Sequence, residues 1–437
     1  MSIAHTAATA KAASIQLAAV GTDQKNAALA DIAAALAAAA EQIIAANKQD
    51  LAAAKKSMLA APLLKRLKFD EGKLSGVCAG IESLIKLPDP VGQVISATEL
   101  DTGLELYKVS CPIGVVGVVF ESRPDALVQI STLCLKSGNA VLLKGGSEAV
   151  NTNRTLSRII AEASEKAGMP HGWIQLLQTR QDVAEMLAQD EYIDLVIPRG
   201  SNEFVRYIMD NTSIPVLGHA DGICHVYVDG DANLDMAVDI VVDSKCQYVA
   251  VCNAAETLLV DSRIAREFLP KVKAALDEKN VALRGCEKTA AIIAVKPATE
   301  EDWSTEYLDY ILSIKVVAGL DEAIDHINRY GSGHTDAIVT ANKNSAEQFM
   351  SLVDSGNVFH NCSTRFSDGF RYGLGAEVGI STNKIHARGP VGLEGLVIYK
   401  YKLRGTGQIV ADYSGPKAKQ FTHKEIRRTS GKREPGA

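Results

Sequence analysis

The sequence predicts an α/β protein with two domains, each built around a parallel β-sheet, and a small β appendage. The chain has 437 residues, which is long for a single hydrophobic core. Short β-branched runs alternate with segments of helical periodicity from Val115 to Gly218, and again from Asp235 to His360. Strands that alternate with helices require crossover connections, and such connections produce parallel sheets.

Composition narrows the classes of function. Hydrophobic residues make up 47% of the chain and charged residues 22%, as in soluble globular proteins. The formal net charge of -6 provides no basic face, so we expect no nucleic-acid partner. The N-terminus lacks the pattern of a secretory signal, and the sequence contains no apolar stretch of about 18 residues. We therefore expect a cytoplasmic protein without a membrane partner.

Cysteines and histidines show no regular framework. The eight cysteines form no CxxC pairs, which favours reduced thiols. The nine histidines lack metal-ligand spacing, so we predict no metal site.

The first half of the chain predicts a helical layer followed by alternating elements. Residues 22–56 are rich in helix formers, with Asp23 as an early cap and Ile32, Leu36 and Ile43 in an apolar stripe. A helix begins at Pro124 and ends before Gly138. The other expected segments are strands at 115–120, 140–143, 174–177, 193–197 and 215–218, and helices at 151–167, 182–188 and 202–210.

The second half predicts a second α/β domain that starts near Asp229. Its expected helices are 235–245, 263–277, 320–330 and 345–353, and its expected strands are 256–260, 291–295, 314–317, 336–340 and 357–360. We thus divide the chain into a cofactor-binding domain (1–228), a catalytic domain (229–398), an appendage (399–421, with 100–110) and a flexible tail (422–437).

Cys252 is the candidate nucleophile, because it lies between a predicted helix and a predicted strand. Such a junction can present a thiol to a cleft while the flanking elements hold it in place. Most free cysteines are inert core residues, so position alone does not decide its role.

The loops after Phe120, Leu143 and Ile197 are candidate cofactor contacts, because parallel sheets bind ligands at the carboxyl ends of their strands. No GxGxxG follows the first strand. Gly200 and Ser201 precede a helix whose backbone N–H groups could meet a pyrophosphate, although a plain helix cap is the alternative interpretation.

Long blocks of sequence resemble the aldehyde dehydrogenase superfamily. These are residues 111–120, 137–148 and 197–201, followed by the cysteine. More narrowly, the blocks at 120–125, 252–257, 361–366 and 373–390 resemble the family of γ-glutamyl phosphate reductases, also called glutamate-5-semialdehyde dehydrogenases. The resemblance covers most of the chain and implies an aldehyde dehydrogenase-like fold, with two Rossmann-like domains and a small β oligomerisation appendage.

The resemblance implies NADPH-dependent reduction of L-glutamyl 5-phosphate to L-glutamate 5-semialdehyde and phosphate, the second step of proline biosynthesis from glutamate. The reaction would pass through a thioester on Cys252, with its backbone N–H and the Asn253 region as oxyanion donors. Hydrolytic members carry a water-activating glutamate, which the stretch 218–223 lacks. His219 or Asp221 could replace that base, or could have a structural or substrate-orienting role.

The same resemblance implies two groups of binding residues. Those for NADPH/NADP are Ser122, Lys144, Ser147, Glu148, Gly200, Ser201 and Glu306. Those for the substrate are Arg123, Asn361, Arg365, Glu377 and Arg388. Ser122 stands where many superfamily members place an oxyanion-binding asparagine, so the oxyanion donors stay open.

Extended segments at 100–110 and 403–413 predict pairing with a second copy, giving a homodimer or homotetramer. A separate glutamate 5-kinase would hand over the labile acyl phosphate. Two other functions stay open: an acylating, coenzyme A-linked aldehyde dehydrogenase, and a non-catalytic scaffold that retains the fold.

Overall fold

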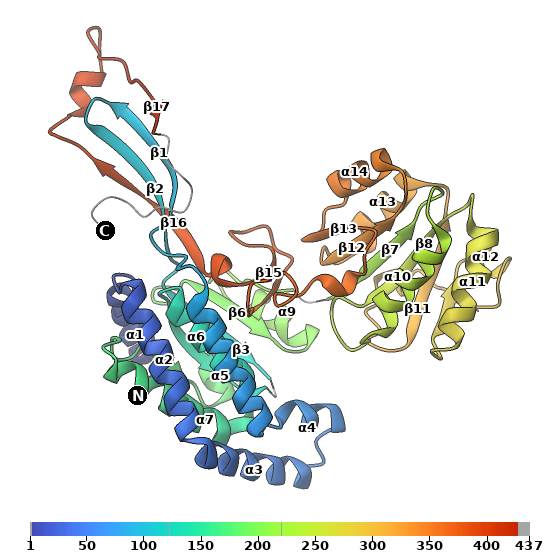
Figure 1. The fold of residues 1–437 in the computed structure, drawn as a ribbon, viewed down its shortest axis with the longest axis horizontal. Helices are drawn as coiled ribbons and strands as arrows, with labels where there is room; N and C mark the ends of the chain where they lie inside the picture. Colours follow the sequence, from blue (N-terminus) through green and yellow to red (C-terminus); the bar gives the residue numbers. More distant parts are fainter. Residues whose placement is uncertain (1, 122, 220, 427–437) are drawn as a thin grey trace.

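The computed structural model describes residues 2–121, 123–219 and 221–426. Two α/β units lie in different parts of the molecule, and an antiparallel sheet projects away from both (Figure 1). The predicted fold class is confirmed.

A layer of helices opens the chain. They are α1 (Ile3–Leu17), α2 (Thr22–Ala38), α3 (Ala40–Lys56), α4 (Ala61–Leu67) and α5 (Glu71–Lys86). The predicted helical segment corresponds to α2 and α3, and Ile32, Leu36 and Ile43 are fully buried as expected. Gly21 is the N-cap of α2, while Asp23 lies in the first turn, so the predicted cap is wrong by two positions. An acidic side chain there still favours the positive end of the helix dipole.

Among the described residues, none of the helices is by itself both long and apolar enough to cross a bilayer. The pair α2 and α3 meets the length and composition test only when joined, across a bend of 67°.

The first unit contains a four-stranded parallel sheet in the order β5-β4-β3-β6. Its elements are β3 (Val115–Phe120), α6 (Pro124–Lys136), β4 (Ala140–Lys144), α7 (Val150–Lys166), β5 (Ile174–Leu176), α8 (Arg180–Leu187), β6 (Leu195–Arg199) and α9 (Asn202–Asp210). The predicted alternation is confirmed. The strand expected at 215–218 is wrong, because only one bridge, Val196 to Val216, forms there. Pro215 cannot donate to a ladder.

The second unit contains a seven-stranded parallel sheet in the order β10-β9-β11-β8-β7-β12-β13. Its strands are β7 (Cys224–Val228), β8 (Ala255–Asp261), β9 (Ala282–Gly285), β10 (Lys296–Pro297), β11 (Ile311–Val317), β12 (Thr335–Val339) and β13 (Asn357–His360). Its helices are α10 (Leu234–Cys246), α11 (Ala265–Asp277), α12 (Glu287–Ala290), α13 (Leu320–Tyr330) and α14 (Lys343–Leu352). β7 joins this sheet although it precedes Asp229.

The strand expected at 291–295 is wrong. Those residues follow the short helix α12, and the nearby strands are β9 and the edge strand β10. Only Ile293 of this apolar run is buried, and a run of five apolar residues fits a helix end and loop as well as a strand, so periodicity alone could not separate them.

A late segment of the chain returns to the first unit. β14 (Gly379–Ser381) pairs with β15 (Gly389–Val391), and Val378, Leu393 and Leu396 are buried in the first core. In Figure 1 this orange-red segment runs beside β6 and α9, between the two units. The two units therefore share the polypeptide more closely than one division near residue 229 would suggest.

The projecting sheet has the order β16-β2-β1-β17 and is antiparallel. Its strands are β1 (Val94–Asp101), β2 (Leu104–Pro112), β16 (Val397–Arg404) and β17 (Lys424–Glu425). The extended structure expected through residue 413 is wrong at its end, where Val410–Tyr413 forms a 3-10 turn. β17 lies inside the predicted flexible tail and pairs with β1, whereas residues 427–437 lie outside the described residues.

Candidate active site

Cys252 lies in the loop between α10 and β8 and is half-buried. Its backbone carbonyl accepts a hydrogen bond from the thiol of Cys224 at 3.2 Å. Gly222 packs against the same peptide, where an added Cβ would lie 2.2 Å from that carbonyl oxygen and 2.4 Å from the Cα atom of Cys252. The start of the second sheet therefore fixes the backbone that carries the sulfur.

Two histidines flank this sulfur. One ring nitrogen of His219, one ring nitrogen of His334 and the Cys252 Sγ atom all lie within 4.8 Å of one another. The two rings meet edge to face, with centroids 4.9 Å apart. His334 is fully buried, and its Nε2 atom has no hydrogen-bond partner among the described residues. These three residues come from distant segments, so sequence spacing gave no sign of the cluster and His334 was missed.

Arg199, at the end of β6, was also missed. Burial lowers the pKa of its guanidinium and Arg123 lowers it further, while Glu377 and Cys252 act in the opposite direction. Within the described residues no hydrogen bond or ion pair engages the Arg199 guanidinium. A desolvated cation of this kind has unused capacity for an anion.

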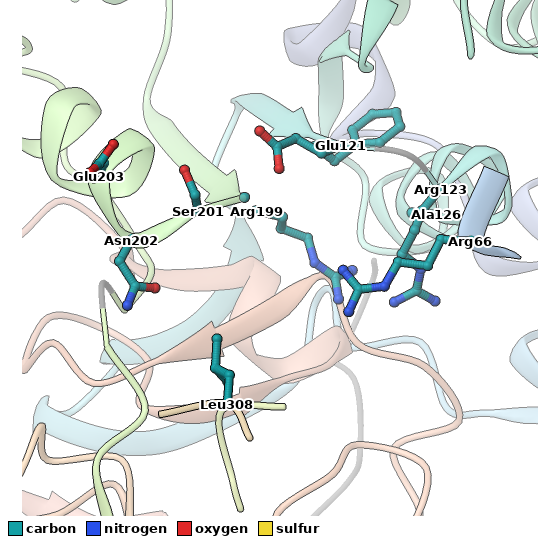
Figure 2. A pocket seen from close by; sticks show the side chains of 11 residues that line it. Arg66, Glu121, Arg123, Ala126, Arg199, Ser201, Asn202, Glu203 and Leu308 are labelled. Atoms are coloured by element: carbon teal, nitrogen blue, oxygen red, sulfur yellow. The ribbon is translucent and has the colours of Figure 1, made fainter. Parts of the chain in front are cut away.

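A cavity of about 580 Å³ opens beside Arg199. Figure 2 shows the guanidinium groups of Arg199, Arg123 and Arg66 on one side of this cavity, with Glu121 and Leu308 also on its wall. Burial raises the pKa of Glu121. The concentration of guanidinium groups suits a phosphate or carboxylate.

A second cavity of about 830 Å³ lies along the carboxyl ends of the first sheet. Its wall includes four predicted cofactor residues, namely Lys144, Ser147, Glu148 and Ser201. Lys144 ends β4, is buried, and donates from Nζ to the Gly145 carbonyl at 2.5 Å. Burial lowers the pKa of Lys144, and Glu148 raises it.

Glycines line both cavities at places where a larger residue would collide with its neighbours, Gly146 at the second cavity and Gly200 at the first. An added Cβ at Gly146 would lie 1.9 Å from Glu148 Oε1, and one at Gly200 would lie 3.1 Å from the Phe204 ring. Gly200 and Ser201 come directly before α9, whose first backbone N–H groups have no partner within the helix. The residues thus fit a dinucleotide, with a helix N-terminus for the pyrophosphate and a lysine beside an acidic side chain for the ribose.

Glu306 lies where the two units meet. Its Oε2 atom accepts from Asn202 Nδ2 at 2.7 Å, and the same amide donates to Asp221 Oδ1 at 2.8 Å. Since Asn202 begins α9, this network joins the helix to the second unit. The predicted contact of Glu306 with a cofactor ribose stays a prediction.

Asn253 is buried and holds a neighbouring turn. Its Nδ2 atom donates to the Ser367 carbonyl at 2.7 Å, and its backbone carbonyl accepts from the Thr364 hydroxyl at 2.7 Å. Its Oδ1 atom is buried without a partner among the described residues and can only accept. One N–H of the amide is thus engaged, and the oxyanion contacts predicted for Asn253 and for the backbone N–H of Cys252 stay predictions.

Arg365 and Glu377 surround the cysteine region. Arg365 is buried, and its Nε donates to Gln247 at 3.0 Å. Burial lowers the pKa of Arg365, and the charge of Cys252 raises it. Glu377 accepts from the Gly369 N–H at 2.8 Å, and burial raises its pKa. Arg365 thus interacts electrostatically with Cys252 and Glu377 with Arg199, and their predicted substrate contacts stay predictions.

Asn361 and Arg388 have structural contacts instead. Asn361 adopts φ +55 and clamps the backbone of Thr340, accepting from its N–H and donating to its carbonyl, each at 2.9 Å. Arg388 donates to the Asp354 carboxylate at 3.0 Å and carbonyl at 2.9 Å, and to the Thr382 carbonyl at 3.0 Å. These bonds give both side chains a structural role, and their predicted substrate contacts stay predictions.

Arg123 pairs with Asp125 at 3.0 Å while lining the cavity beside Arg199. Ser122, the predicted cofactor contact before it, lies outside the described residues.

Comparison with known proteins places this geometry in a family. The model named "Aldehyde dehydrogenase family" matches residues 2–291. A protein of Acetivibrio thermocellus named γ-glutamyl phosphate reductase is 67% identical over 426 residues, which are 98% of this chain and 99% of that one. The chain belongs to the γ-glutamyl phosphate reductase family, within the aldehyde dehydrogenases.

Solved structures agree with this assignment. The crystal structure of γ-glutamyl phosphate reductase from Thermotoga maritima is 41% identical, with a TM-score of 0.91, over 94% of this chain and 100% of that chain. An acetylating aldehyde dehydrogenase from Geobacillus thermoglucosidasius, 17% identical with a TM-score of 0.63, covers 93% of this chain and 97% of its own, and shares the fold.

Proposed function

We propose that this protein reduces L-glutamyl 5-phosphate to L-glutamate 5-semialdehyde and phosphate, with NADPH as the reductant and Cys252 as the nucleophile. The observation that carries the proposal is the position of Cys252. Its sulfur lies within 4.8 Å of a ring nitrogen of His219 and of one of His334, and its charge acts on Arg199 and Arg365, in a chain 67% identical to a γ-glutamyl phosphate reductase.

The Cys252 thiolate attacks the acyl carbon, the bond from that carbon to the phosphate oxygen breaks, and a thioester remains. Bound NADPH supplies the hydride that reduces this thioester. The backbone N–H of Cys252 donates to the oxyanion. Arg199 receives the phosphate, since no hydrogen bond or ion pair within the described residues engages its guanidinium. Arg365 neutralises further negative charge.

Lack of a glutamate in the 218–223 stretch supports phosphate release over hydrolysis. At this place the described residues provide His219 and Asp221, and Asp221 is bonded to Asn202 and Arg206. An efficient water-activating carboxylate would destroy the thioester before reduction. The coenzyme A-linked alternative would need the same thioester, so only an assay that compares phosphate with coenzyme A separates the two functions.

The experiment runs the reaction in reverse. Wild type, given glutamate 5-semialdehyde and NADP, should reduce NADP only when phosphate is present, and coenzyme A should not replace phosphate. Cys252→Ser should lower the rate by about a thousandfold or more. Cys362→Ser, which alters another half-buried thiol, is the matched control and should leave the rate unchanged. Activity retained in Cys252→Ser would refute the proposal.

NADPH, rather than NADH, is supported by two cations at the second cavity. Lys144 and Arg180 both line it, together with Glu148. A 2′-phosphate adds negative charge that these cations would pair. Arg180→Gln should raise the KM for NADPH about tenfold and leave the KM for NADH nearly constant, if a charge-assisted bond is lost. Equal changes for both cofactors would contradict the preference.

The projecting sheet supports self-association. Exposed apolar side chains gather on β16 and the segment after it, including Tyr401, Leu403, Ile409 and Val410. We extend the proposal to a homodimer or homotetramer that pairs through this sheet, acts in the cytoplasm and receives its labile acyl phosphate from glutamate 5-kinase. Sedimentation of wild type and Leu403→Asp tests the assembly, and product transfer in a mixture with the kinase, against a trapping enzyme, tests the handover.

A further inference from the structure

The structure distinguishes His219 from Asp221, the two residues that could replace the missing glutamate as a base. Both oxygens of Asp221 are engaged, Oδ1 by Asn202 at 2.8 Å and Oδ2 by Arg206. His219, in contrast, places a ring nitrogen within 4.8 Å of Cys252 Sγ.

The tautomer of His219 follows from its backbone contact. Its Nδ1 atom lies 3.0 Å from the Ile380 carbonyl oxygen, which can only accept, so Nδ1 carries the hydrogen. Nε2 of the neutral ring then has a lone pair for a proton. Burial lowers the pKa of His219, Glu306 and Asp221 raise it, and Arg199 lowers it, so the ring is neutral near pH 7.

We propose that His219 Nε2 accepts the proton of the Cys252 thiol and delivers it to the departing phosphate. This inference rests on the proposed function. His219 thus occupies the place of a water-activating glutamate, but it accepts a proton from the Cys252 thiol and not from water. The gap of up to 4.8 Å is bridged by one water molecule or closed by rotation of the Cys252 side chain, as is usual before substrate binds.

The protons balance in this scheme. The Sγ–H bond breaks and an Nε2–H bond forms as the sulfur bonds to the acyl carbon. The carbon–oxygen bond to the phosphoryl group then breaks, and the leaving oxygen takes the proton from Nε2, so the phosphate departs as monohydrogen phosphate. After reduction Sγ leaves as a thiolate, and a solvent proton restores the thiol through the same ring.

His334 holds the other side of this arrangement. Its ring meets that of His219 edge to face, and its Nδ1 atom lies 2.8 Å from the Thr335 hydroxyl and 3.8 Å from Cys224 Sγ. We assign it a positioning role, because it limits rotation of the His219 ring. It is also the rival base, so the test includes it.

The test follows alkylation of Cys252 by iodoacetamide in the full-length protein, with the modified peptide quantified by mass spectrometry at each pH. In wild type the rate should change little between neutral pH and the onset of thiol ionisation, because a neutral His219 assists the thiol. In His219→Asn, whose amide can still donate to Ile380, the rate should fall about tenfold for each unit by which the pH is lowered from the onset of thiol ionisation to neutral pH. At high pH, where the thiol ionises unaided, both proteins should react equally.

His386→Asn is the matched control. Its Nε2 atom also bonds a backbone carbonyl, of Gly395 at 2.9 Å, and its profile should equal that of wild type. Added imidazole should restore the neutral-pH rate in His219→Gly, which tests the role should the asparagine variant fold poorly. An unchanged profile in His219→Asn, or the loss in His334→Asn alone, would overturn the inference. Neither result depends on turnover, whereas active Cys252→Ser would defeat the proposed function itself.

Discussion

The thiol of Cys224 donates to the backbone carbonyl of Cys252 at 3.2 Å, so one cysteine supports the peptide that carries the other. Burial raises the pKa of Cys224 well above its ordinary value, and the negative charges of Asp336 and Cys252 add to this. Cys224 therefore stays protonated and acts as a donor, while Cys252, the proposed nucleophile, is only half-buried.

Replacing Cys224 tests this support. Cys224→Ala leaves the Cys252 carbonyl without its donor, and the loss of about 1 kcal/mol should lower kcat roughly fivefold. Cys224→Ser keeps an O–H donor and should stay near wild-type activity. Steady-state rates and the Cys252 alkylation rate check the pair, and equal kcat values for the two variants would show that the hydrogen bond has no influence on turnover.

Gly222→Ala should be far more harmful. The new methyl would overlap the backbone of Cys252, at 2.2 Å from its carbonyl oxygen, and backbone atoms cannot move aside as a flexible side chain can. A shift of the nucleophile by about 1 Å costs on the order of a hundredfold in kcat. Gly80→Ala is the control. Gly80 lies within α5, a Cβ added there would meet no atom within 4 Å, and the substitution should raise the free energy of unfolding by up to about 1 kcal/mol. Near-normal kcat in Gly222→Ala would mean that the loop tolerates displacement.

Arg199→Met should weaken substrate use. A charge-assisted hydrogen bond of about 1.5 to 3 kcal/mol corresponds to a loss in kcat/KM of roughly tenfold to a hundredfold. Arg199→Lys should recover only part of this, because an ammonium lacks the planar fork. Arg66→Met, which removes an exposed guanidinium from the same cavity, should have a smaller effect. Competition by inorganic phosphate supplies the independent measurement, and equal effects of the two methionine variants would argue against a special role for Arg199.

The buried His326 side chain should make the free energy of unfolding decrease at acidic pH. Burial lowers its pKa to about 2, with help from His225 and the cations Lys315 and Arg329, whereas the unfolded chain binds a proton near 6.5. Below pH 6.5 the unfolded chain therefore binds a proton that the folded protein does not bind. The contribution of neutral His326 to the free energy of unfolding is fully present above pH 6.5 and is lost by about 1.4 kcal/mol for each unit that the pH falls.

The measurement compares urea midpoints at pH 7.5 and 5.5 in wild type and two variants. His326→Phe, which keeps the contacts with Trp303 and Tyr330, should lose less stability between these values than wild type. His171→Phe changes an exposed histidine and should behave as wild type. An identical pH dependence in all three proteins would exclude His326 as the titrating group.

Hydrophobic periodicity predicted most of the fold, because it reports burial directly. The bounds of β3, α9, α13 and β13 agree with the structure to the residue. Short strands such as β9 and β10 carry too few residues for a pattern. β7 was missed although it is fully buried.

The site was predictable only where chemistry stays local in the sequence. Cys252 and the loop after β4 could be chosen as candidates because a junction or a strand end marks them. His334 and Arg199 were missed, since their roles depend on neighbours from distant segments. Asn361 and Arg388 lie in family-like blocks, yet their polar atoms bond to backbone groups and to Asp354, so a motif does not separate binding from support.

The return of Val378, Leu393 and Leu396 to the first core constrains biogenesis. During synthesis the amino-terminal unit emerges from the ribosome early, but its core cannot close until nearly the whole chain has been made. Its apolar surface is exposed meanwhile, when chaperones would bind and aggregation would compete. A fragment ending at residue 228 should consequently be insoluble by itself, and co-expression of the remaining residues should rescue it.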